Sequence, residues 1–207
     1  MAAMFRSWGL FWWLVAGISI ADLIALPRVD WHSDRSVEAL ILRTILVVLP
    51  CLVAAFLASS LARLWPGRVT RWLMANRRYV GLAFAAGMAW HFVFVGYFFW
   101  AFGYRLEPQD ITLDVIGVLF LVAMTWTSFP TWSGRLSPAN WHRLHKAGIF
   151  TLWFLPTFFF LEDFVRERDV FDGAALGSLL VVLAVRAAAG RAVPFEAHAD
   201  RRSGGRP

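Results

Sequence analysis

The sequence predicts an all-α integral membrane protein, a bundle of six transmembrane helices with its N-terminus and C-terminus in the cytoplasm. Three observations lead to this prediction. Of the 207 residues, 59% are hydrophobic, and the mean hydropathy is +0.58, which is more apolar than a soluble domain. Six apolar runs approach the roughly 20 residues that a helix needs to cross a bilayer. The charged residues, 16% of the chain, gather between these runs.

The six predicted spans follow from the apolar runs in chain order. The first begins near the N-terminus without an evident signal-peptide cleavage site, so we expect it to be retained. The fifth becomes long enough only with the amphipathic stretch before it, from Trp141, and the sixth is rich in alanine. Their predicted boundaries are 7–26, 37–61, 79–102, 111–130, 147–161 and 173–190. We expect residues 1–190 to form one transmembrane domain and residues 191–207 a disordered cytoplasmic tail.

The charges between the spans predict the topology. Segments 62–78 and 131–146 contain basic residues and no acidic residue, whereas 27–36, 103–110 and 162–172 are acidic or mixed. Short loops rich in Lys and Arg stay in the cytoplasm. The alternation predicts that both termini are cytoplasmic and that the number of spans is even. We therefore attribute the net charge of +6 to the basic cytoplasmic loops. The expected partner is the lipid bilayer, and we do not expect the protein to bind nucleic acid.

Charged side chains inside the spans need neutralisation or a route to water. Asp22, in the first predicted span, and Arg43, in the second, should lie at similar depth near the outer interface. We expect them to form an ion pair; the alternative is that Arg43 snorkels to the outer headgroups. For Arg186, near the inner end of the sixth span, we expect a snorkelling side chain.

His91 lies near the middle of the third span, where an ionisable side chain is most often functional. His142 and His145 are three residues apart and share roughly one helical face before the fifth span. We expect His142 at the interface and His145, one turn deeper, inside the bundle. His32 and His198 have no Cys or His at ligand spacing nearby and are not site candidates.

The residues around these histidines resemble the ferric reductase-like transmembrane family. The resemblance lies in segment 77–82 leading to His91, and in the Leu-His pair that ends at His145. Similar features are segment 60–63 (Ser-Leu-Ala-Arg), the Thr-Ser pair at 127–128, and Trp141. Within the family, the pattern is most similar to the haem-binding membrane subunits of bacterial methionine-sulfoxide reductase systems.

This resemblance implies a b-type haem between the third and fifth spans. In the wider family each of those helices supplies one histidine to an inner haem and one to an outer haem; the sulfoxide-reductase subunits have an arginine in place of the first. Arg77, fourteen residues before His91, matches that arginine. His91 resembles the outer ligand of the third span and His145 the inner ligand of the fifth. Phe158, thirteen residues after His145, stands where the outer partner is expected.

The depths of the two histidines argue against one haem shared between them. At 1.5 Å rise per residue, His91 and His145 should differ in depth by roughly 14 Å. Two nitrogens that bind one iron lie about 4 Å apart, and helix tilt does not close that gap.

Three alternatives remain open. A haem could use one histidine, either His145 with Arg77 beside a propionate, or His91 with Phe158 against the ring. The missing ligand could come from a partner subunit or from a sulfur, Met88 or Met124 being the candidates. In the third case haem has been lost, and the histidines form hydrogen bonds between helices.

The leading hypothesis is a haem-b-binding membrane subunit of the bacterial inner membrane. It would pass electrons from quinol or a flavoprotein to a partner reductase or another acceptor. The chain has no dinucleotide-binding fingerprint, so as an oxidoreductase subunit it would depend on a separate protein for NAD(P)H. The alternative is a haem-free membrane scaffold or assembly protein with the family fold. A transporter or channel is less favoured, because Asp22 is the one acidic residue expected at such depth.

Overall fold

The computed structural model describes residues 8–103 and 108–191, and the regular structure in them is helical throughout. This confirms the predicted all-α class. The long helices are α1 (Trp8–Ala25), α2 (Asp34–Leu64), α3 (Arg68–Phe102), α4 (Pro108–Thr127), α6 (Pro138–Glu167) and α7 (Val170–Arg191). The short ones are a 3₁₀ turn, η1 (Leu26–Arg28), and α5 (Pro130–Ser133). The predicted tail, apart from Arg191, lies outside the described residues.

Most of the long helices could cross a membrane by length and composition. Five segments of the described chain satisfy both criteria: Trp8–Arg28, Asp34–Leu64, Arg68–Phe102, Pro138–Glu167 and Val170–Arg191. In α4 the apolar segment Thr112–Thr127 is shorter. The architecture is thus a bundle of five or six long apolar helices, as expected of a multi-pass membrane protein.

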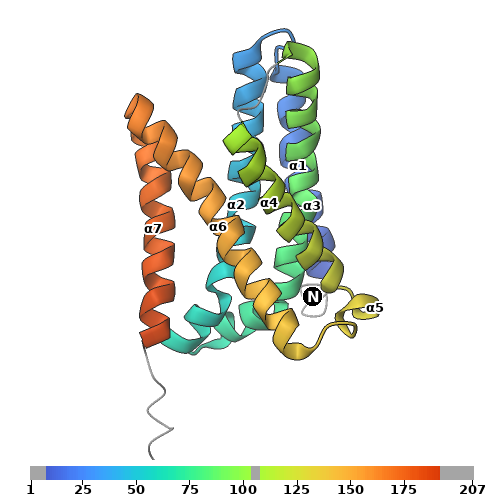
Figure 1. The fold of residues 1–207 in the computed structure, drawn as a ribbon, viewed down its shortest axis with the longest axis vertical. Helices are drawn as coiled ribbons and strands as arrows, with labels where there is room; N and C mark the ends of the chain where they lie inside the picture. Colours follow the sequence, from blue (N-terminus) through green and yellow to red (C-terminus); the bar gives the residue numbers. More distant parts are fainter. Residues whose placement is uncertain (1–7, 104–107, 192–207) are drawn as a thin grey trace, which may run out of the picture.

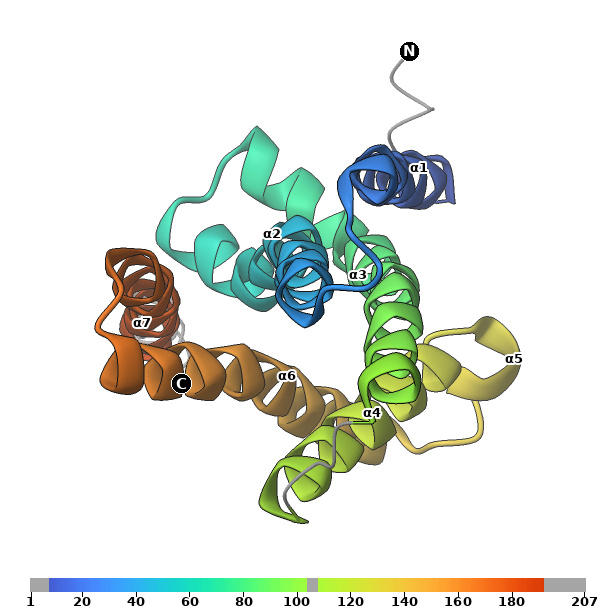
Figure 2. The ribbon, with the colours of Figure 1, turned by 90° about the horizontal axis from the view of Figure 1, so that it is seen from above.

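Successive long helices run in alternate directions (Figure 1). The start of α1, the α2–α3 connection, the α4–α6 connection and the end of α7 lie at one end of the bundle. We call this the basic end, because it carries segments 62–78 and 131–146. The α1–α2 connection and the turn between α6 and α7 lie at the opposite end. The most extensive helix pair is α2 and α3, which lie side by side at the centre of the view from above (Figure 2). On either side of that pair, α1 packs on α3, and α6 contacts both α4 and α7.

At the basic end, α3 begins eleven residues before its predicted span. The N–H of Gly67 donates to the hydroxyl of Thr70 (2.9 Å), and that hydroxyl donates to the carbonyl of Trp65 (2.8 Å). These bonds satisfy backbone groups at the helix start. The first turns of α3 are charged, so the apolar run did not include them. Because they are helical, Arg77 lies well inside α3.

The same difference occurs in α6, which begins at Pro138 rather than in the range from Trp141 to Ala147. Ser137 is the N-cap, and its hydroxyl accepts from the N–H of Asn140 (3.3 Å). Pro138 follows at the first helical position, where its missing N–H does no harm. Ser-Pro is therefore a helix-start signal, and it places His145 two turns inside the helix.

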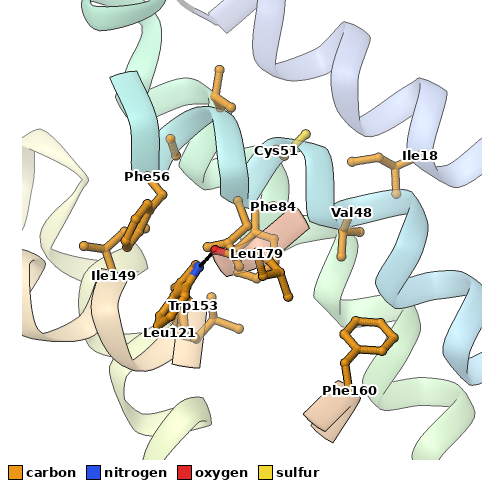
Figure 3. Close-up of a cluster of buried hydrophobic side chains, with 14 of the residues drawn as sticks. Ile18, Val48, Cys51, Phe56, Phe84, Leu121, Ile149, Trp153, Phe160 and Leu179 are labelled. Carbon is orange, nitrogen blue, oxygen red and sulfur yellow. Dashed lines mark hydrogen bonds between the residues drawn. The ribbon is translucent and has the colours of Figure 1, made fainter. Parts of the chain in front are cut away.

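A buried core joins α2, α6 and α7 next to α3 (Figure 3). Phe56 is fully buried, and its ring stacks on Trp153 at 5.8 Å between centroids. The indole N–H of Trp153 donates to the carbonyl of Leu179 (3.3 Å), as Figure 3 shows. Trp153 therefore buries its ring against α2 and satisfies its N–H in α7, and so links α6 to both of these helices.

The predicted ion pair between Asp22 and Arg43 does not form. Arg43 Nη2 donates to the backbone carbonyl of Ala21 (2.9 Å). The Asp22 side chain is fully buried, and neither carboxylate oxygen has a hydrogen-bond partner among the described residues. The prediction was wrong because depth alone does not decide a contact: the carboxyl group is enclosed by the bundle, while the guanidinium lies on its exposed side.

Candidate functional site

His145 lies in α6 at the basic end and is held by α4. Its Nε2 atom is 3.1 Å from Oγ1 of Thr127. Its ring stacks on Trp141, one turn earlier, at 4.0 Å between centroids and 24° between planes. The indole N–H of Trp141 in turn donates to the carbonyl of Thr127 (3.2 Å). The end of α4 therefore orients both aromatic rings.

The hydrogen bonds of Thr127 determine the tautomer of His145. The hydroxyl proton of Thr127 is donated to the carbonyl of Ala123 (2.7 Å). A hydroxyl has one proton to give, so in the contact with His145 it must accept, and Nε2–H of the imidazole is the donor. A neutral imidazole then keeps its lone pair on Nδ1. A neutral histidine with a single hydrogen bond of this kind, whether or not it binds a metal, keeps one ring nitrogen that can act as an acceptor or a ligand.

His145 lines a partly open cavity of about 850 Å³ at the basic end, bounded by α2, α3, α4, α6 and α7. Pockets for cofactor-sized ligands are roughly 300–1,000 Å³ in volume. Apolar side chains form much of its wall, among them Leu52, Ala55, Phe84, Leu121, Ile149, Phe150 and Leu152. Its basic side chains are Arg63, Arg77, Arg78, His142, His145, Lys146 and Arg186. No Asp or Glu is present among the described residues that line it.

Arg77 and His145 line this same cavity from α3 and α6, and the charge of Arg77 acts on the imidazole. The combination of an imidazole, a guanidinium and an apolar wall fits a haem by its donor chemistry: one axial nitrogen and one partner for a carboxylate. Met124, one of the two candidate sulfur ligands, also lines the cavity. Its sulfur packs against Gly148, where a Cβ atom would overlap it. Met88 is not among the lining residues and packs against the hydrophobic core.

His91 is not among the residues that line the cavity. It is half-buried in α3, and its Nδ1 lies 3.1 Å from the hydroxyl of Thr44 in α2. That hydroxyl donates to the carbonyl of Ile41 (2.6 Å). By the same argument as for Thr127, Nδ1–H of His91 is the donor, and Nε2 keeps the lone pair.

Phe158 is half-buried in α6, with ring contacts to its own helix. It stacks on Phe154 (5.8 Å between centroids, 29° between planes) and meets Phe159 edge to face at 6.0 Å. In the described part of the chain its ring has no recorded contact with His91, whose aromatic partner is Phe92 at 5.6 Å. Of the sequence-predicted site residues, the fold thus brings together Arg77 and His145.

Two polar side chains in the membrane helices, one lining the site and one outside it, were missed or misread from the sequence. Arg186 does not snorkel: its guanidinium points into the bundle, where it contacts Phe56 and Phe150 and lines the cavity. Thr44 was not singled out, although it positions His91. In both cases the available signal was a polar residue within an apolar run, which is rarely without a partner in a membrane helix.

The described residues contain no group of three or more His, Cys, Asp or Glu side chains that could hold a metal ion. Comparisons with protein-family models, with curated proteins and with solved structures gave no match.

Proposed function

We propose that this chain is a haem-b-binding electron-transfer subunit of the ferric reductase-like kind, with haem in the cavity at the basic end. In this proposal six helices span the bacterial inner membrane, and the basic end and both termini face the cytoplasm. Electrons would pass from quinol or a flavoprotein to a partner reductase or another acceptor.

One observation carries the proposal. Arg77 and His145 are 68 positions apart in the sequence, each matches a position of the family pattern, and both line one cavity of about 850 Å³. Of the alternatives that the sequence left open, this favours the inner, single-histidine site over the outer one, because His91 does not line the cavity.

The residues have distinct roles in this proposal. His145 would bind the iron through the ring nitrogen that keeps its lone pair, with Thr127 and Trp141 holding the ring. Arg77 would neutralise a propionate. The apolar part of the wall would pack against the porphyrin ring. The haem itself would supply reversible one-electron chemistry.

A spectrum of the purified protein tests the proposal. We expect dithionite-reduced minus air-oxidised bands of a b-type haem, with a pyridine haemochrome content near one haem per chain. His145→Ala should abolish the bands, whereas His91→Ala, a histidine with an equivalent threonine contact outside the cavity, should retain them. A folded wild-type protein without haem, produced with haem available, would reject the proposal. Bands that survive His145→Ala and vanish with His91→Ala would move the haem to the outer site.

A specific observation favours a second candidate, a haem-free scaffold or assembly protein. Each histidine already has a partner on a neighbouring helix, Thr127 for His145 and Thr44 for His91. Hydrogen bonds of this kind join membrane helices without any cofactor. In that case His145→Ala and His91→Ala should lower the unfolding temperature to similar extents, and neither protein should bind haem.

A further inference from the structure

Arg186 is a membrane-helix arginine that is held inside the bundle by two other helices. From α7 its Nη1 donates to the backbone carbonyl of Phe56 in α2. Its guanidinium lies over the ring of Phe56 at 4.2 Å and over the ring of Phe150, in α6, at 4.8 Å. A carbonyl and two aromatic faces all stabilise a cation. They also set its position, so that the guanidinium is ordered before any ligand arrives.

The charge of Arg186 is nevertheless uncompensated. Within the described residues it has no acidic partner, and the nearby charges that act on it, those of Arg63 and Arg77, are also positive. A guanidinium has five N–H donors, and the Phe56 carbonyl accepts from one nitrogen. Four arginines therefore line one largely apolar cavity, Arg63, Arg77, Arg78 and Arg186, although such charges are costly in a membrane unless they are paired.

An anion in the cavity would resolve this imbalance. The planar fork of arginine matches the oxygens of a carboxylate or a phosphate. The apolar wall calls for a hydrophobic body attached to that anion, and basic pockets between membrane helices on the cytoplasmic side are known to take anionic lipid headgroups. The cavity thus combines arginines that could bind an anionic head with an apolar wall that could bind the hydrophobic body of an amphiphile.

We propose that Arg186, together with Arg63, binds the anionic head of an amphiphile, a carboxylate or a phosphate, whose apolar body lies along the wall that includes Leu121 and Leu152. The proposal rests on the proposed function for the identity of the amphiphile and for the cytoplasmic orientation of the basic end. The propionates of haem and the phosphate of a phospholipid are two sources of the same chemistry. Arg186 is therefore a ligand-binding residue rather than an interfacial anchor.

Two pairs of probes separate these sources. Haemin is compared with haemin dimethyl ester, which has the same ring and iron but no carboxylate, by quenching of tryptophan fluorescence. Dioleoylphosphatidylglycerol is compared with dioleoylphosphatidylcholine, by native mass spectrometry of the full chain in detergent. The variants are Arg186→Gln and Arg63→Gln. Arg43→Gln is the matched control, because Arg43 also donates to a backbone carbonyl but does not line the cavity.

We expect the wild type and Arg43→Gln to bind at least one anionic probe about tenfold more tightly than its neutral counterpart, and Arg186→Gln to lose most of that preference. Loss of the preference for haemin identifies carboxylates as the head. If Arg186→Gln loses the preference for phosphatidylglycerol and the wild type does not bind haemin, the head is a phosphate. That result rejects the proposed function but not the anion site.

The opposite result overturns this proposal. If Arg186→Gln and Arg63→Gln bind both anionic probes as tightly as the wild type, or if the wild type shows no preference for either anion, the cavity is not an anion site. Haemin binding that is independent of both arginines would leave the proposed function intact. Should Arg186→Gln fail to fold, Arg63→Gln decides, because no hydrogen bond or ring contact of Arg63 is recorded in the described structure.

Discussion

Nε2 of His145 lies 3.1 Å from the hydroxyl of Thr127, across the contact between α6 and α4. Because the Thr127 proton is bonded to the carbonyl of Ala123, the imidazole donates and its other nitrogen keeps the lone pair. Thr44 holds His91 in the same way, but through Nδ1. Each histidine is thus held in one tautomer by a threonine on the neighbouring helix, and what differs between them is the cavity at His145.

The contact predicts that Thr127→Val weakens both the fold and the site. Valine keeps the shape but leaves the imidazole N–H without its acceptor, a loss of about 1 kcal/mol for a half-buried group. We expect a lower unfolding temperature and less haem per chain. Thr151→Val is the matched control, because the Thr151 hydroxyl donates to a carbonyl of its own helix (Ala147, 3.1 Å) and has no recorded histidine contact. Equal effects of the two substitutions on haem content would contradict the assigned role of Thr127.

At Gly87, side chains of α1 and α2 pack directly against the backbone of α3. A Cβ atom there would lie 2.5 Å from Cγ1 of Val48 and 3.1 Å from Cγ2 of Ile18. Valine and isoleucine are stiff at χ1 and cannot readily move aside. Gly87→Ala should therefore destabilise the protein by about 1–3 kcal/mol, measured by unfolding in mixed micelles. Gly96→Ala, in the same helix with nothing within 4 Å of its Cβ position, should not. A stable Gly87→Ala variant would mean that the three helices separate easily.

The apolar runs were sufficient to predict the all-α class and the regions of the long helices. Charged turns were not: the first turns of α3 and α6 carry arginines, histidines and a lysine, so hydropathy stopped short of Arg68 and Pro138. These helical turns contribute to the site: Arg77 and His142 both line the cavity, and both lie in the charged segments, 62–78 and 131–146, that separate the predicted apolar spans.

The side-chain partners were harder to predict than the helices. Asp22 and Arg43 were paired by depth, but pairing also depends on the angle at which each side chain leaves its helix, and that angle follows from packing. Arg186 was expected at the interface because long side chains usually reach it. The rings of Phe56 and Phe150, from two distant parts of the chain, offered it a closer partner. No local sequence pattern contains that information.

Ser137 should matter for stability more than its exposed position indicates. Its hydroxyl accepts from the N–H of Asn140 (3.3 Å) and caps α6 two turns before His145. Ser137→Ala should lower the free energy of unfolding by about 1 kcal/mol. Ser137→Asp should retain the cap, because a carboxylate accepts the same bond and suits the helix dipole. Thermal unfolding of the two variants compares them directly. If alanine and aspartate behave alike, the cap contributes nothing measurable.

Asp22 predicts a substitution that increases stability. Its side chain is fully buried, and neither carboxylate oxygen has a hydrogen-bond partner in the described structure. A charge on a side chain inside a membrane helix costs about 2.5–3.5 kcal/mol, and the positive charge of Arg43, which acts on Asp22, offsets part of that cost. Asp22→Asn keeps the shape and removes the charge, so we expect unchanged or higher stability, by up to about 3 kcal/mol.

The control for Asp22→Asn is Asp30→Asn, at an exposed carboxylate that accepts from the N–H of His32 (3.1 Å). Its effect should stay within about 0.5 kcal/mol. Chemical unfolding in mixed micelles, with membrane insertion checked first, measures both variants. A large loss of stability in Asp22→Asn alone would contradict the prediction, and would mean either that the acid makes an interaction that the amide loses or that the new N–H donors are buried without an acceptor.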